Sequence, residues 1–210
     1  GIFRDNIVPV AIPGIGIVSL DNGPREDTTI EKISKLKGAF DPENGTVTAA
    51  NSSFLTDGAA AVMLMSEEKA KALGLTAQAY IKTFAHTAQN PLDELLLGPA
   101  FAVPKALAKA GLKLDDIGVL EIHEAFAVQM IANINLLQSA DFAQEKLGLS
   151  DKIGEIDMDR LNVHGGSLSL GHPFGATGAR LIMDCCRRMV NEDSQFGLVA
   201  GCAAGAVGNA

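Results

Sequence analysis

Large aromatic residues and basic residues are both scarce in this 210-residue sequence. Tryptophan is absent, tyrosine occurs once, and the formal net charge is −8. Few rings are therefore available to stack on nucleic-acid bases, and an acidic chain lacks the basic face that binders of the phosphate backbone carry. We expect no nucleic-acid partner. Any anionic ligand would have to be held by specific lysines, arginines or helix N-termini.

Cysteine is also rare, with three residues at positions 185, 186 and 202. This odd number, without framework spacing, fits a reducing compartment better than a secreted domain stapled by disulfides. No metal-ligand spacing accompanies the cysteines, so no metal site is expected. Cys185 and Cys186 fall in an expected helix, where unpaired cysteine usually packs as a small hydrophobic residue.

Long apolar runs are missing, although 47% of the residues are hydrophobic. No stretch of about 18 uninterrupted apolar residues occurs, which predicts no ordinary membrane-spanning helix. The composition is still sufficient for a buried core. The sequence opens Gly1-Ile2-Phe3 without methionine or a targeting segment, and it ends Gly208-Asn209-Ala210 as though entering another strand. We expect truncation at one or both ends.

Apolar runs and turn residues predict alternating strands and helices. Strands are expected at residues 59–65, 78–84, 117–122 and 196–200. Helices are expected at residues 28–37, 66–73, 101–110, 124–137 and 176–190. Thr28 and Glu31 have capping-box spacing, Pro104 is expected in a first helical turn, and a glycine-punctuated loop is expected at 161–173. The alternation favours an α/β protein with helices layered on a mixed sheet.

Reactive side chains concentrate in three glycine-rich places, at residues 123–126, 165–173 and 201–205. His123 falls at the junction of a strand and a helix, where layered α/β proteins often place their chemistry. A second histidine, His172, lies in a loop, and Cys202 lies in a later turn. Each alone is also compatible with a structural role. Together, two histidines and a cysteine could converge on one thioester as a catalytic Cys-His site with a nucleophile, a base and oxyanion donors.

The order of three motifs resembles that of the thiolase family over nearly all of the sequence. Residues 162–180, NVHGGSLSLGHPFGATGAR, resemble the thiolase histidine loop, and residues 45–61, GTVTAANSSFLTDGAAA, resemble the segment that meets the pantetheine of coenzyme A. The run CAAG at 202–205 resembles the motif of the second cysteine. Within the family, the sequence is most similar to β-subunits of fatty-acid oxidation trifunctional enzymes. This similarity rests on histidine at position 123, where most thiolases have asparagine, and on the runs LLLGP at 95–99 and GGSLSLGHPFGATG at 165–178.

The resemblance implies a thiolase-like layered α/β/α architecture with a mixed sheet, incomplete because the N-terminal half is absent. It divides the sequence into a loop and CoA-contacting region at 1–53, a last strand and helix of the N-terminal half at 54–75, and a C-terminal thiolase domain at 76–210. The family's nucleophilic cysteine lies in the preceding half, and no residue here matches it. This chain alone is therefore expected to be inactive.

The resemblance also assigns roles to individual residues. His172 matches the base for the nucleophilic cysteine, Cys202 the acid/base group at the α-carbon, and His123 the residue that positions a water at one oxyanion site. Ala204 is often glycine in the family, but its backbone N–H can still serve the other oxyanion site. Ser53 matches a serine that hydrogen-bonds the pantetheine, and small residues that let CoA approach are matched by Ala49 and Ala50.

The expected reaction is the cleavage of a 3-oxoacyl-CoA by CoA into acetyl-CoA and a shortened acyl-CoA, the last step of fatty-acid β-oxidation. Coenzyme A is a substrate here, and no permanently bound cofactor is expected. The resemblance implies a homodimer, a trifunctional α-subunit as partner, and a bacterial cytoplasm or mitochondrial matrix with membrane association through the complex. Two alternatives stay open: biosynthetic formation of acetoacetyl-CoA, and a noncatalytic CoA-binding or assembly module.

Overall fold

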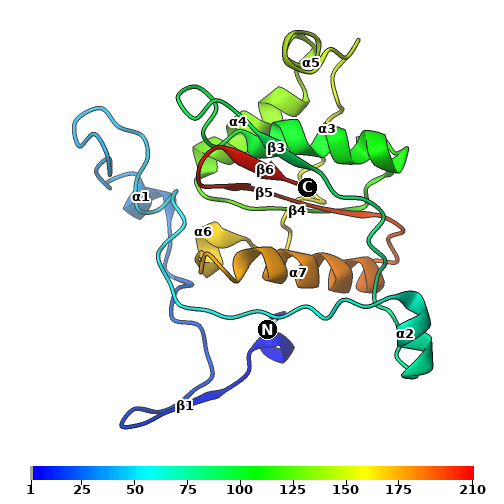
Figure 1. Cartoon of the computed structure of the whole chain (residues 1–210). Helices are drawn as coiled ribbons and strands as arrows, with labels where there is room; N and C mark the ends of the chain where they lie inside the picture. Colours follow the sequence, from blue (N-terminus) through cyan, green and yellow to red (C-terminus); the bar gives the residue numbers. More distant parts are fainter. Residues whose placement is uncertain (1) are drawn as a thin grey trace.

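A computed structural model describes residues 2–210 and contains a mixed four-stranded sheet (Figure 1). The strand order is β3-β6-β5-β4, in which β4 and β5 are parallel and the other two pairs are antiparallel. The bounds are β3 (His86–Ala88), β4 (Val119–Ile122), β5 (Gly197–Ala203) and β6 (Val207–Asn209). The parallel pair ends with Ile122 opposite Ala200, and this edge leads directly into the residues expected to carry chemistry.

Helices cover both faces of the sheet. Helices α3 (Gly98–Ala110) and α4 (Ala127–Leu137) lie on one face, and α7 (Thr177–Asn191) lies on the other (Figure 1). The core between the sheet and its helices is aliphatic and includes Val103, Leu107, Leu120, Ile122, Met130, Leu137, Leu198 and Ala200. The expected α/β class with helices layered on a mixed sheet is confirmed.

Residues 2–97 are more exposed to solvent than the rest of the described chain. They contain η1 (Arg4–Asn6), a two-stranded hairpin of β1 (Val10–Ile12) and β2 (Gly16–Val18), α1 (Ile30–Ile33), α2 (Glu67–Ala72) and β3. The shorter elements of the second half are η2 (Leu114–Asp116), α5 (Ala140–Leu147) and α6 (Ser167–Leu170). None of the helices between residues 2 and 210 combines the length and apolar character needed to cross a bilayer.

Two expected strands, at 59–65 and 78–84, are wrong. Neither range pairs with another strand in the described part of the chain, and the first strand of the sheet, β3, begins only at His86. Met63 and Leu64 are exposed. A strand is defined by its ladder of inter-strand hydrogen bonds, so an apolar run without a neighbouring strand does not become one.

Three expected helix starts also differ from the structure. Helix α3 begins at Gly98, so Pro99 takes the first-turn position and Pro104 lies inside the helix. A Cβ at Gly98 would stand 2.5 Å from the Cα of Gly208, which shows how closely this helix end approaches β6. Helix α4 begins three residues later than expected, and α1 is capped by the side chain of Thr29 in place of Thr28.

A buried ion pair joins α7 to β4. Arg188 donates from Nη1 to Oε1 of Glu121 over 2.7 Å, and both side chains are 1% exposed. The guanidinium also donates hydrogen bonds to the backbone carbonyl of Arg160 and to Glu192. Its buried N–H groups therefore have several acceptors. Burial raises the pKa of Glu121, against the opposing effect of Arg188. The neighbouring Cys185 is buried, as expected from its packing role.

Candidate active site

His123 lies immediately beyond the carboxyl end of β4. Its backbone N–H donates to the carbonyl of Ala200 over 2.8 Å, which continues the β4–β5 ladder by one residue. Gly201 lies against it, because a Cβ there would stand 3.4 Å from that of His123. The imidazole is 4% exposed. The junction expected from the sequence thus places this histidine in the interior, at the end of the parallel strands.

His172 follows the short helix α6 in the glycine-rich loop. Its backbone N–H donates to the carbonyl of Phe54 over 3.2 Å, and its Nδ1 lies 2.7 Å from the hydroxyl oxygen of Thr177. That hydroxyl lies 3.2 Å from the carbonyl oxygen of Pro173, which can only accept. If Thr177 donates to Pro173, its oxygen accepts from Nδ1–H of His172. This assignment satisfies both bonds and leaves Nε2 of His172 unprotonated, as a base requires.

The two histidine rings are in contact, with centroids 4.0 Å apart and an angle of 37° between their planes. The pKa of His123 is lowered to about 4 by burial and, to a smaller degree, by the positive charges of His172 and Arg180. Burial and Arg180 also lower the pKa of His172. Both imidazoles are therefore neutral at pH 7, so one can accept a proton and the other can donate a hydrogen bond.

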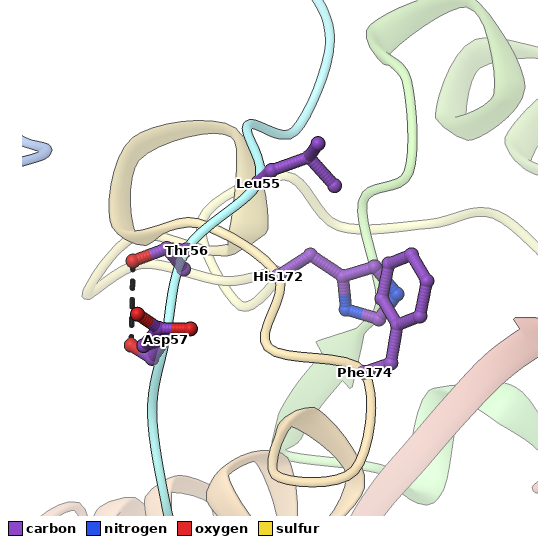
Figure 2. Close-up of a pocket in the computed structure, with 5 residues that line it drawn as sticks. All are labelled: Leu55, Thr56, Asp57, His172 and Phe174. Atoms are coloured by element: carbon purple, nitrogen blue, oxygen red, sulfur yellow. Dashed lines mark hydrogen bonds between the residues drawn. The ribbon is translucent and has the colours of Figure 1, made fainter.

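A pocket of about 440 Å³ opens beside His172. Figure 2 shows the rings of His172 and Phe174 next to each other, with residues 55–57 of the neighbouring segment completing the lining. The lining combines an aromatic ring, an aliphatic side chain and the carboxylate of Asp57. A ligand in this pocket would reach the histidine that carries the unprotonated nitrogen.

The histidine loop is clamped to the end of β4 by two polar residues that sequence reasoning left without a role. Asn162 accepts from the N–H of Ile122 and donates to its carbonyl, both over 2.8 Å. Glu124 accepts from Asn162 over 2.7 Å and from the backbone N–H of Leu168 over 3.1 Å. Glu124 stands beside His123 in the sequence, but its loop partners are 38 and 44 residues away. Spacing alone could not reveal this contact.

Cys202 lies in strand β5, opposite Gly208 of β6, and not in a turn as expected. It follows Gly201, the residue that lies against His123, so the strand that carries the thiol runs alongside that histidine. Cys202 is half-buried, and burial raises the pKa of its thiol. At neutral pH the group is therefore a protonated thiol, which can deliver a proton. Ala204 lies two residues further on, in the exposed turn between β5 and β6.

The segment expected to meet CoA packs on the chain just after His123. The N–H of Ser53 donates to the carbonyl of Ala125 over 2.9 Å, and the carbonyl of Asn51 accepts from Ala127 over 2.9 Å. Ser52 and Phe126 form the bridge between the two segments. Ala49 and Ala50 lie in an exposed turn before this contact. The segment thus reaches the same edge of the molecule as the two histidines.

The other two cysteines lie on α7, as expected. The thiol of Cys185 packs towards Gly197, where a Cβ would stand 2.4 Å from its sulfur. Burial raises the pKa of Cys185 to about 12, and burial also raises that of Cys186. A thiol that stays protonated is a weak nucleophile. Neither residue is suited to replace an activated cysteine.

Two family models together match most of the chain. They are described as "Thiolase, N-terminal domain", over residues 1–68, and "Thiolase, C-terminal domain", over residues 75–210. Among curated proteins, the chain is 51% identical over its whole length to the mitochondrial trifunctional enzyme subunit beta of Bos taurus, of which it covers 44%. It is 49% identical over 209 residues to the 3-ketoacyl-CoA thiolase of Shewanella putrefaciens, of which it covers 48%.

A solved structure of a related enzyme has the same fold. The acetyl-CoA acetyltransferase of Bacillus anthracis superposes with a TM-score of 0.83 at 38% sequence identity, over 99% of this chain and 48% of that one. The chain therefore spans less than half the length of the relatives that it matches.

Proposed function

We propose, since the chain belongs to the thiolase family, that it supplies the proton-transfer half of a 3-ketoacyl-CoA thiolase site. The observation that carries the proposal is the contact of two neutral histidines, His123 and His172, at the end of the parallel strands. Thiolytic cleavage needs a base for a thiol and hydrogen-bond donors for a developing oxyanion. Of two adjacent neutral imidazoles, one can accept a proton and the other can donate a hydrogen bond, so the pair can serve both needs.

In the proposed first half-reaction, Nε2 of His172 takes the proton of a nucleophilic cysteine supplied from outside these 210 residues. The thiolate attacks C3 of the 3-oxoacyl-CoA, and the bond between C2 and C3 breaks. The electron pair remains on C2 as the enolate of acetyl-CoA, and the Cys202 thiol protonates that carbon. The products are acetyl-CoA and an acyl-enzyme thioester.

In the second half-reaction, CoA takes the place of acetyl-CoA and restores the proton that Cys202 gave up in the first. The CoA thiol loses its proton to the Cys202 thiolate and attacks the acyl thioester. The bond to the nucleophilic cysteine breaks, so a shortened acyl-CoA leaves and the cysteine thiolate is reprotonated by His172. The protonated thiol of Cys202, which burial favours, is the state that the first half-reaction uses.

Negative charge develops on two carbonyl oxygens during these steps. We assign one to His172 together with a water held by His123, and the other to backbone amides that include Ala204. A donor of this kind is typically worth a factor of about 10² to 10³ in rate. Ser53 is proposed to hydrogen-bond the pantetheine of CoA, and the small side chains of Ala49 and Ala50 to let it approach the turn that they form.

The substrates, partners and compartment of the complete protein follow from its relatives as part of this proposal. We propose fatty-acid β-oxidation as the process, a homodimer as the thiolase unit, and a trifunctional α-subunit as partner, in a bacterial cytoplasm or mitochondrial matrix. Coenzyme A takes part as substrate. Acetoacetyl-CoA synthesis uses the same catalytic groups in reverse, so chain-length kinetics of the full-length protein decide between the two directions. A noncatalytic CoA-binding module would bind CoA and form no acyl-enzyme.

The test separates the two proton transfers in the full-length protein. His172→Asn should lose the acylation burst, because it removes the base for the nucleophile. Cys202→Ser should retain acylation from an acyl-CoA and lose exchange of the α-protons of acetyl-CoA, because a hydroxyl is a much weaker acid than a thiol. Cys186→Ser, on α7, is the matched control. Unchanged acylation in His172→Asn, or near-normal exchange in Cys202→Ser, would remove that residue from the mechanism.

A further inference from the structure

We propose that Ser167 is a positioning residue that holds His123 in the neutral tautomer with its proton on Nε2. The inference rests on the proposed thiolase function for its purpose, but its evidence is a hydrogen-bond chain within this molecule. The chain runs from Asp184 through Arg180 and Ser167 to His123. Nothing in the motifs of the sequence assigns Ser167 a part in the chemistry.

The chain of contacts is short and buried. Ser167 begins α6 and is fully buried, with its hydroxyl oxygen 3.0 Å from Nδ1 of His123 and 3.4 Å from Nη2 of Arg180. The guanidinium is held from the other side by Asp184, whose Oδ2 accepts from Nη1 over 2.9 Å. Asp184 itself is 4% exposed. Arg180 is thus fixed by a buried carboxylate and directs a second donor at the serine.

The direction of each bond follows from the number of protons available. A guanidinium can only donate, so the Ser167 oxygen accepts from Arg180. The serine has a single hydroxyl proton, and among the described residues the only other partner of its oxygen is Nδ1 of His123. If Nδ1 also carried a proton, two donors would face the oxygen and the hydroxyl proton would be buried without an acceptor, which is unfavourable. Ser167 therefore donates to an unprotonated Nδ1.

A neutral imidazole carries one proton, so His123 must carry it on Nε2. Neutrality is supported by its burial and by the two positive or potentially positive groups beside it, Arg180 and His172. The hydrogen-bond assignment above gives His172 the opposite tautomer, with a free Nε2. The two contacting rings then present one N–H donor and one lone pair. The N–H of His123 can hold the oxyanion water in the way an asparagine amide would.

The first test reads the tautomer of His123 directly, by NMR. The full-length protein is labelled with ¹⁵N in its histidines, and the signals of His123 are identified as those that disappear in His123→Asn. At pH 7 these signals should show a protonated Nε2 and an unprotonated, hydrogen-bonded Nδ1. In Ser167→Ala the Nδ1 donor is gone, so the His123 signals should move towards a mixture of tautomers. The exposed His86 on β3 should keep its signals. The proposal would be overturned if His123 of the wild-type protein carried its proton on Nδ1, or if the His123 signals were unchanged in Ser167→Ala.

The second test measures catalysis in the same proteins. Ser167→Ala should lower kcat by about tenfold or more at unchanged KM, because a wrong imidazole tautomer removes an oxyanion donor without altering CoA binding. Ser167→Thr, which keeps the hydroxyl, should restore the Nε2–H tautomer and part of kcat. Ser169→Ala is the control, because among the residues that the structure describes its hydroxyl bonds only the carbonyl of Gly166, the N-cap of α6.

The outcomes distinguish a failure of the proposed thiolase function from a failure of the proposed role of Ser167. A wild-type protein that shows the Nε2–H tautomer but forms no acyl-enzyme would contradict the thiolase function and leave the hydrogen-bond chain intact. A Ser167→Ala variant with altered tautomer signals and unchanged kcat would show that Ser167 sets the tautomer but that catalysis does not depend on it, which would overturn the positioning role.

Discussion

Replacing His123 by asparagine should make the protein less sensitive to acid. Burial, His172 and Arg180 lower the pKa of this imidazole from its ordinary value of 6.5 to about 4. Between these two values the unfolded chain binds a proton that the folded chain excludes, so stability falls as the pH falls. Well above pH 6.5 both states are neutral and the imidazole contributes no pH dependence. The shift of about 2.5 units corresponds to about 3 kcal/mol, lost between pH 7 and pH 4.

The measurement is urea unfolding of the full-length protein and of His123→Asn at several values of pH from 7 to 4. The free energy of unfolding should fall by about 3 kcal/mol more in the wild type than in the variant over this range. Other buried acids, such as Glu121 and Asp184, are present in both proteins, so their effects cancel in the difference. His86→Asn, at the exposed histidine of β3, is the matched control. Equal pH dependence in the wild type and His123→Asn would refute the reasoning.

Three further predictions address the loop clamp, the buried ion pair and the half-buried thiol. Gly166→Ala should reduce the acylation rate by about tenfold or more, measured as burst kinetics, because its Cβ would stand 2.2 Å from Oε2 of Glu124 and displace the histidine loop. Arg188→Met should lower the free energy of unfolding by about 3 to 5 kcal/mol in urea, because it leaves Glu121 buried without its partner; a loss under 1 kcal/mol would contradict this. Alkylation of Cys202 by iodoacetamide should have its pH midpoint above that of a free thiol, and a lower midpoint would exclude the proton-donor state.

Elements with their own local start and stop signals were predictable from the sequence. Helix α2 begins after Ser66, whose side chain accepts from the N–H of Lys69, and it is followed by Gly74 with a φ of +65°. Helix α7 and strand β4 likewise lie within a residue or two of their expected bounds. For α2 the determining contacts span a few residues, so the sequence pattern contains them. Strand β4 was recognisable from its apolar run, although the strand that it pairs with, β5, lies far along the chain.

Pairing between distant segments was not predictable in the same way. The apolar runs at 59–65 and 78–84 have the composition of strands, yet they lack a strand neighbour within residues 2–210. Conversely, β6 is only three residues long, and it is a strand because β3 and β5 both pair with it. Local composition describes what one segment can do, whereas a ladder requires two segments to meet.

In the candidate site, the position of single protons on the histidine rings could not be predicted from the sequence either. The motifs identify His123 and His172 as residues of interest, but an imidazole can be a base, a donor or a cation, and the letter in the sequence is the same for each. For His123 the choice depends on Ser167, 44 residues away, and that serine's one proton is in turn directed by Arg180. A histidine can serve as a hydrogen-bond donor in such a site only if a neighbour holds the ring's proton on the correct nitrogen. The chemistry of position 123 is therefore a property of the buried chain behind it as much as of the residue itself.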